Sequence, residues 1–231
     1  MPKLKEISYF CPAYNEEENL KTHIQKILPV LAAIADNYEL LIINNGSTDQ
    51  TPKIADNLAA QNPRIRVIHH ESNRDYGGAL KTGFENCNYE WIAYTDSDLQ
   101  YDFGEIREML PFLSECDGVI GIRKNRQDSL YRKFQSKIFN LLTKLMFRLK
   151  AKDINCSFKV IKKEFIDRIK ITSRSSFIDA EILIKTQKKG AKFKEMEVTH
   201  YPRIAGAATG HRPQVIFITF KEMFQTLFHK H

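Results

Sequence analysis

The segment Trp91-Ile92-Ala93-Tyr94-Thr95-Asp96-Ser97-Asp98 is the strongest indication of how this chain folds. Its apolar first half predicts a short buried strand that would deliver two carboxylates, one residue apart. In an open α/β sheet, ligands bind beyond the carboxyl ends of the strands, where this pair would lie. Carboxylate oxygens suit a hard divalent cation, and Mg²⁺ commonly combines one or two carboxylates with substrate phosphates. The alternative is that the aspartates form a turn or cap a helix.

Length and composition fit one large domain. The chain has 231 residues, of which 42% are hydrophobic and 27% charged, and this length can bury a full core. No apolar run reaches the roughly 18 residues that span a bilayer, and residues 1–6 lack the apolar core of a signal peptide. We therefore expect a cytoplasmic protein. The four cysteines lack CxxC spacing, so we expect reduced structural thiols rather than a zinc site.

Strand-like and helix-like stretches alternate through the first half of the chain. This order predicts an α/β fold with a mostly parallel central sheet, three α/β/α layers and a single domain. The expected strands are 7–11, 40–43, 65–68, 91–94 and 118–122, and the expected helices are 17–35, 51–60, 79–87 and 105–113. In the second half we expect helices over 130–149 and 178–189 and strands over 157–161 and 192–198. We expect the main domain over 1–210 and an amphipathic helical tail over 211–231.

Three further polar loops follow strands and would leave the same edge of the sheet as the two aspartates. They are 11–17 (Cys-Pro-Ala-Tyr-Asn-Glu-Glu), 44–49 (Asn-Asn-Gly-Ser-Thr-Asp) and 73–78 (Asn-Arg-Asp-Tyr-Gly-Gly). Each loop alone is explained by a turn or a helix cap. Four such loops at one edge predict a nucleotide pocket at the strand ends.

Three of these motifs, in this order and spacing, make the chain resemble the family 2 glycosyltransferases. They are Pro-Ala-Tyr-Asn-Glu-Glu, Asn-Gly-Ser-Thr-Asp and Asp-Ser-Asp-Leu-Gln. The chain is most similar to the branch of dolichyl- and polyprenyl-phosphate sugar synthases, from about residue 7 to residue 210. The resemblance implies a GT-A fold and an inverting, metal-dependent transfer of a sugar from a UDP- or GDP-sugar to a polyprenyl or dolichyl phosphate.

The resemblance also implies roles for individual residues. It implies donor binding by Pro12, Tyr14, Glu16, Ile43, Asn45, Asp96, Ser97, Asp98 and Arg203. Among these, Asp96 and Asp98 would hold Mg²⁺ or Mn²⁺, with Asp98 as the more direct ligand, and Arg203 would grip the diphosphate. Arg123 and Arg132 match arginines on the acceptor side.

Two positions depart from the family pattern. Asn44-Asn45 stands where the family usually has two aspartates, and an amide adds hydrogen-bond donors and removes charge. The base therefore stays open between UDP and GDP. Thr209 stands where synthases of mannosyl carriers have a lysine, so the sugar stays open as well.

The identity of the acceptor decides which groups the chemistry needs. The departing diphosphate needs its charge stabilised, by a metal at Asp98 and Asp96 and by Arg203. A lipid phosphate is already anionic, so arginines that position it would suffice. A hydroxyl of a glycan or glycolipid would need a carboxylate base, for which Asp179 and Glu181 are the candidates. Both residues equally fit the role of acidic charge at a helix N-terminus.

Basic residues are concentrated between Arg123 and Lys152, with ten Lys or Arg against the single acid Asp128. Such a segment predicts an anionic partner, namely phosphates, a membrane surface or nucleic acid. For residues 130–149 we expect core packing with an exposed basic rim. The phenylalanine-rich tail favours contact with a membrane surface or a partner protein. Asp153, just beyond the segment, fits a loop residue that supports the site.

These features predict a peripheral protein at the cytoplasmic face of the membrane. A membrane-protein partner or a homo-oligomer stays open. Nucleic-acid binding is not expected, because no stacking-aromatic motif or groove-reading helix accompanies the basic segment. A non-catalytic nucleotide-sugar binder is a further alternative, motivated by Asn44-Asn45.

Overall fold

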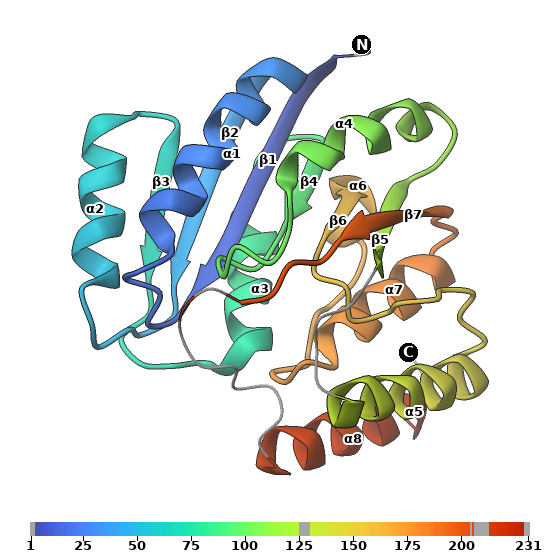
Figure 1. The fold of residues 1–231 in the computed structure, drawn as a ribbon. Helices are drawn as coiled ribbons and strands as arrows, with labels where there is room; N and C mark the ends of the chain where they lie inside the picture. The colour runs from blue at the N-terminus through green and yellow to red at the C-terminus, as the bar shows by residue number, and fades with distance from the viewer. Residues whose placement is uncertain (1–2, 125–129, 204, 206–212, 229–231) are drawn as a thin grey trace.

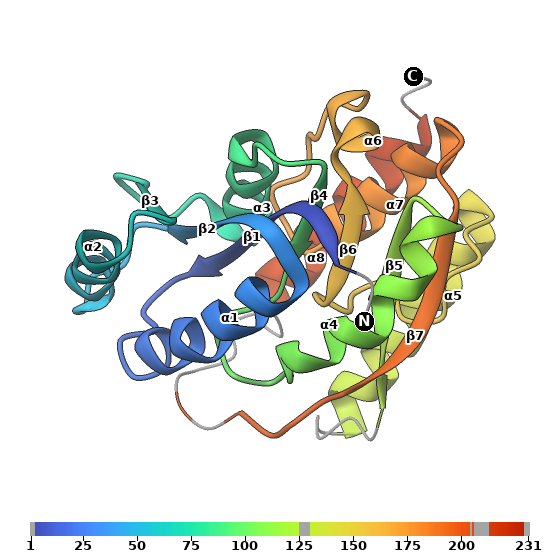
Figure 2. The ribbon, with the colours of Figure 1, turned by 90° about the horizontal axis from the view of Figure 1, so that it is seen from above.

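A seven-stranded sheet runs through the molecule and has helices on both faces (Figures 1 and 2). The computed structural model describes residues 3–124, 130–203, 205 and 213–228, and for residues 130–132 and 213 the backbone alone. The strands are β1 (Leu4–Ala13), β2 (Ala35–Asn44), β3 (Ile65–His69), β4 (Trp91–Tyr94), β5 (Gly118–Lys124), β6 (Lys159–Lys162) and β7 (Phe193–Thr199). Their order is β3-β2-β1-β4-β6-β5-β7. β6 pairs antiparallel with β4 and β5, while the other neighbours are parallel, which confirms the predicted mostly parallel sheet.

Two layers of helices cover the sheet. One face carries α1 (Leu20–Ile34), α2 (Thr51–Gln61) and the short turns η1 (Phe103–Glu105), α4 (Ile106–Met109) and η2 (Leu110–Ser114). The other face carries α3 (Asp75–Asn86), α6 (Lys163–Asp167) and α7 (Ile178–Lys188). Successive strand residues point to opposite faces, so Tyr9 packs in the first core and Phe10 in the second. Because the central strands are buried on both sides, they read as continuous apolar runs.

A pair of helices, α5 (Leu130–Phe147) and α8 (Pro213–Phe228), lies at the end of the molecule towards which the parallel strands point (Figure 1). The rings of Phe139 and Phe220 meet edge to face, with their centroids 6.3 Å apart. The hydroxyl of Thr143 lies 3.7 Å from the sulfur of Met223. A third core cluster joins this pair to α7.

The expectation of core packing for residues 130–149 is wrong for one side of α5. Phe134 is 62% exposed and Leu145 is 69% exposed, and Ile138 and Leu141 are exposed on the same stripe. On α8, Phe217 is likewise 70% exposed. Helical periodicity identifies an apolar stripe but does not say whether it faces the core. Among the residues that the structure describes, none of the helices combines the length and the apolar character that a membrane-spanning segment needs.

Several boundaries differ from the predictions for local reasons. α1 begins at Leu20 and ends at Ile34, and β2 starts at the very next residue, so the helix is shorter than 17–35. The helix expected over 105–113 is broken into two 3₁₀ turns and one α-turn, near Pro111, which lacks an N–H to donate. Gly77 and Gly78, expected in a loop, belong to the first turn of α3. The short helix α6 was not predicted.

Candidate active site

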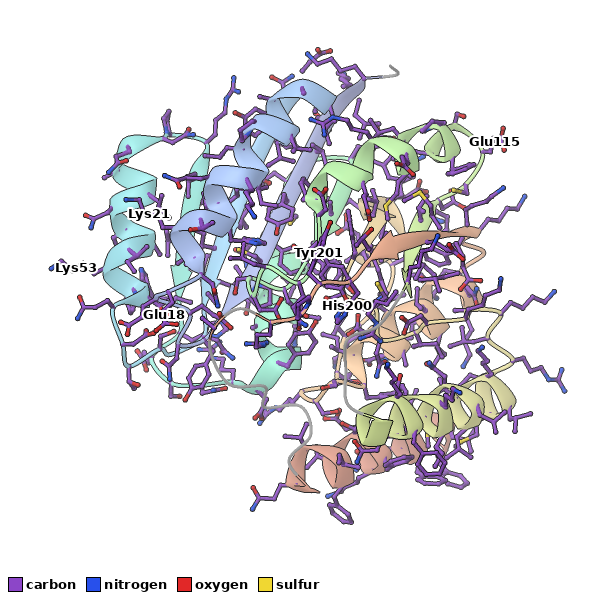
Figure 3. All side chains as sticks on the ribbon, viewed as in Figure 1. Glu18, Lys21, Lys53, Glu115, His200 and Tyr201 are labelled. Atoms are coloured by element: carbon purple, nitrogen blue, oxygen red, sulfur yellow. The ribbon has the colours of Figure 1, made fainter. Side chains whose placement is uncertain are left out.

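The polar loops at the carboxyl end of the sheet enclose a cavity of about 450 Å³. α5 and α8 complete its wall, together with the start of α7 and the segment that follows β7. His200, on that segment, lines the cavity and lies in Figure 3 between the sheet and the α5–α8 pair. The predicted site residues that line the cavity are Pro12, Tyr14, Glu16, Asn45, Asp96, Ser97, Asp98, Arg123, Asp179 and Arg203. The sheet therefore brings the predicted loops together.

The loops around the cavity contain backbone in the left-handed region. Asn15, Asp75 and Leu99 have φ values of 54°, 60° and 61°. This conformation is unfavourable for residues with a Cβ, and most of all for bulky ones such as leucine. At Leu99 it turns the chain so that the Gln100 N–H donates to Asp98 Oδ1 over 3.2 Å. The carboxylate after β4 is thus held by its own loop.

Asp96 is fixed by two hydroxyl groups from other elements. Tyr76 donates to its Oδ1 over 3.1 Å, and Ser157 donates to its Oδ2 over 2.7 Å. Burial raises the pKa of Asp96 to about 6, and the charge of Asp98 adds to this rise. Both hydroxyls are distant in sequence, so no local motif could have identified them. Tyr76 lies in a predicted loop, and only the position of this loop after β3 could have identified it as a site residue.

Arg203 links two carboxylates at the cavity. Its Nη2 donates to Asp98 Oδ2 over 2.6 Å, and its Nη1 donates to Glu16 Oε1 over 3.4 Å. Asn19 donates to the other oxygen of Glu16 over 2.7 Å. Burial raises the pKa of both Glu16 and Asp98, and Arg203 only partly opposes this rise. Arg203 therefore offsets the cost of burying these two carboxylates only in part.

The donor set fits a hard divalent cation that is shared with a ligand. Asp96 and Asp98 supply oxygen donors, which Mg²⁺ and Mn²⁺ prefer. Within the described part of the chain, no group of three or more His, Cys, Asp or Glu side chains could hold a metal ion. The two carboxylates would therefore share the cation with other oxygens, such as those of a diphosphate or water.

Asn45 uses its whole side-chain amide within the protein. Its Oδ1 accepts from the Arg74 N–H over 3.0 Å and lies 2.8 Å from His70 Nδ1. Its Nδ2 donates to the Asp75 carbonyl over 3.0 Å and to Asn73 Oδ1 over 3.2 Å. Asn45 lines the cavity, and its amide holds the loop that leads into α3; its contact with a base or ribose stays a prediction.

Ile43 does not reach the cavity. Its side chain is fully buried in the core between the sheet and α3. The sequence pattern placed it at the end of β2 but could not give the direction of its side chain. The side chain of Arg132 and the whole of Thr209 lie outside the described residues.

Arg123 lies at the cavity and is locked by a second residue. Its Nε and Nη2 each donate to one oxygen of Asp153 over 2.7 Å, and its backbone N–H donates over 3.2 Å. This fork geometry fixes the guanidinium plane. Asp153 thus supports the site, as its sequence position suggests.

The two candidate bases differ in their surroundings. Asp179 lines the cavity, but its Oδ1 accepts from Tyr94 over 2.6 Å and forms an ion pair with the buried Lys159. Glu181 is fully buried, does not line the cavity, and pairs with Lys185 and the hydroxyl of Thr172. Burial opposes ionisation of Glu181, yet these hydrogen bonds lower its pKa. The structure therefore leaves only Asp179 at the cavity, with one oxygen already engaged.

The fold is that of the GT-A glycosyltransferases. Glucosyl-3-phosphoglycerate synthase from Mycobacterium tuberculosis superposes with a TM-score of 0.76 at 15% identity, over 98% of this chain and 81% of that chain. A structure of that enzyme with Mn²⁺, UDP and phosphoglyceric acid has a TM-score of 0.77 at 15% identity, over 98% of this chain and 80% of that chain. At this identity the likeness shows the fold alone.

Residues 8–170 match the family model described as "Glycosyl transferase family 2". The chain therefore belongs to family 2 of the glycosyltransferases. It is 30% identical to glycosyltransferase AglD of Haloferax volcanii over 86% of this chain. It is 33% identical to undecaprenyl-phosphate 4-deoxy-4-formamido-L-arabinose transferase of Photorhabdus laumondii over 88% of this chain. The chain spans 33% of the first relative and 62% of the second.

Proposed function

We propose that this glycosyltransferase moves a sugar from a nucleoside-diphosphate sugar to a polyprenyl phosphate at a membrane surface. The observation that carries the proposal is the cavity, which joins a carboxylate pair and an arginine at the strand ends to a wall made by α5 and α8. The name of the Photorhabdus relative, an undecaprenyl-phosphate sugar transferase, supports the choice of acceptor.

On the donor side, Asp96 and Asp98 would hold Mg²⁺ or Mn²⁺ together with the diphosphate. When bound, such a cation offsets the charge that develops on the leaving diphosphate. Arg203, whose guanidinium donates to Asp98, would add charge-assisted hydrogen bonds to the oxygens of the diphosphate. Pro12 and Tyr14, which line the cavity, would flank the nucleoside.

On the acceptor side, Arg123 would position an anionic phosphate. Asp153 holds its guanidinium in place, so less side-chain freedom is lost on binding. A phosphate oxygen is already a nucleophile and needs no strong base. Asp179 is engaged by Lys159 and Tyr94, which favours a phosphate over a sugar hydroxyl as the acceptor.

The α5–α8 pair would lie against the membrane. The same two helices line the cavity and carry exposed apolar residues, with Phe134 62% and Phe228 77% exposed. α5 contains no acidic residue and several lysines, so its charge complements anionic lipid. A lipid phosphate held by this surface would have its headgroup next to the cavity.

A ligand screen tests the donor half of the proposal. We expect UDP or GDP to raise the thermal unfolding temperature in the presence of Mn²⁺ or Mg²⁺, because a ligand that binds the native state stabilises it by mass action. The rise should vanish when EDTA removes the metal. No shift with either nucleotide and either metal would contradict a nucleotide-sugar donor.

A further inference from the structure

Glu222, on α8, holds the loop between α6 and α7. Its carboxylate accepts from the Arg174 N–H over 2.9 Å, from the Ser175 N–H over 3.2 Å and from the Ser175 hydroxyl over 2.6 Å. The same hydroxyl accepts from the Phe177 N–H over 3.1 Å, just before α7. Hydrogen bonds to an ionised carboxylate are about twice as strong as neutral ones. The three hydrogen bonds to Glu222 therefore hold this loop against α8.

The loop is bonded to α3 on its other side. The Gly77 N–H donates to the Arg174 carbonyl over 2.7 Å. A Cβ on Gly77 would lie 2.5 Å from the Arg174 carbonyl carbon, which is too close for any side chain. Residues 174 and 175 are therefore held between α8 and the first turn of α3.

The first turn of α3 carries two contacts to the donor side of the cavity. Tyr76, next to Gly77, donates to Asp96 over 3.1 Å. The carbonyl of Asp75 accepts from Asn45 over 3.0 Å. Asp75 has a φ of 60°, a left-handed conformation that aspartate adopts more readily than most residues, and its N–H donates to Asn73 Oδ1 over 2.7 Å.

We propose that Glu222 is a positioning residue. Its hydrogen bonds hold residues 174–175 against α8, and these residues fix the position of the first turn of α3 and thereby the positions of Asp96 and Asn45. The inference rests on the proposed function, which gives Asp96 its part in donor binding, while Asn45 holds the loop that leads into α3. Because α8 also presents the exposed Phe217 and Phe224, a surface that binds α8 would act on the donor site through this chain of contacts. Donor affinity should therefore depend on a residue that does not line the cavity.

Two substitutions and one control variant distinguish this positioning role from an effect on the stability of the fold alone. Glu222→Ala removes the acceptor of all three hydrogen bonds, and Glu222→Gln keeps one oxygen. Gln225→Ala changes an exposed residue of the same helix and serves as the matched control. If Glu222→Ala fails to fold, Glu222→Gln carries the test with a smaller effect in the same direction.

The first readout needs no ligand. Amide hydrogen exchange, followed by mass spectrometry, should speed up in peptides that cover 172–177 and also in peptides that cover 73–78 in the Glu222 variants. Gln225→Ala should match the unsubstituted chain in both regions. Faster exchange that stays within 172–177, or unchanged exchange in both, would overturn the inference.

The second readout is the dissociation constant of UDP and of GDP with Mn²⁺, measured by calorimetry. We expect Glu222→Ala to weaken the nucleotide that binds by about tenfold, a size typical of coupling through packed contacts. Unchanged affinity in Glu222→Ala would overturn the inference. Failure of the unsubstituted chain to bind either nucleotide would instead contradict the proposed function, and the exchange comparison would then decide the inference.

Discussion

Asn45 stands where the family usually has an aspartate, and its hydrogen-bond partners are the ones that an amide needs. A backbone N–H at Arg74 faces its amide oxygen, and a backbone carbonyl at Asp75 faces its amide nitrogen. These partners fix the orientation of the amide, because a carbonyl can only accept and an N–H can only donate. An aspartate here would point a carboxylate oxygen at the Asp75 carbonyl.

We therefore predict that Asn45→Asp destabilises the fold by about 1–3 kcal/mol, the cost of buried polar groups that lose their partners. Denaturant unfolding measures this loss. Asn44→Asp is the matched control, because the Asn44 amide nitrogen faces a ring nitrogen of His69, which can carry a proton. Equal losses in the two variants would contradict this role of Asn45.

His23, on α1, is buried and neutral and contacts Tyr9 of β1. Its Nε2 lies 2.7 Å from the hydroxyl of Tyr9, which lies 2.7 Å from the hydroxyl of Thr95. Burial lowers the pKa of His23 from 6.5 to about 3. Between these values the unfolded chain binds a proton at His23 and the folded chain does not.

The contribution of His23 to stability is therefore fully present above pH 6.5 and is lost as the pH falls towards 3. Between pH 7.5 and pH 5 the expected loss is about 2 kcal/mol. Denaturant unfolding of the unsubstituted chain and of His23→Gln at both pH values isolates this contribution from those of other groups. The difference in the free energy of unfolding between the two chains should be smaller at pH 5 than at pH 7.5. A difference that does not change with pH would contradict this role of His23.

For the helices and strands, the sequence predicted which elements exist better than it predicted where they end and which of their sides are buried. β4 has the expected bounds, because a buried strand flanked by polar residues is marked on both sides. The segment 105–113 was predicted as one helix, but it forms short turns near Pro111, which lacks an N–H to donate. α5 was assigned correctly as a helix, but its exposed side was not, since both of its sides carry apolar residues.

The exposed side of the α5–α8 pair yields a prediction about lipid. The double substitution Phe217→Ser and Phe224→Ser removes apolar area from residues that do not line the cavity. We expect it to lower flotation with vesicles of phosphatidylcholine and phosphatidylglycerol, because interfacial binding scales with buried apolar area. Nucleotide affinity without vesicles should stay unchanged. Equal flotation of both proteins would contradict membrane contact through α8.

At the scale of the whole molecule, the site depends on contacts between distant parts of the chain. Asp98 meets Arg203, and Asp96 meets Ser157. The alternation of strands and helices predicted which loops share an edge, because parallel strands end on the same side. It could not predict the antiparallel β6, or that α8 supplies part of the cavity wall, since both are set by packing between segments far apart in sequence.

Sugar transfer to a lipid phosphate is the reaction to measure. The purified chain, with Mn²⁺ and labelled UDP- and GDP-sugars, is given polyprenyl phosphate or the matching polyprenol, which lacks the phosphate. We predict a labelled lipid product from the phosphate only, and about a hundredfold less of it with Asp98→Asn, because several kcal/mol of charge stabilisation is lost. Labelling of polyprenol as fast as polyprenyl phosphate, or undiminished transfer by Asp98→Asn, would contradict the proposed reaction and its site.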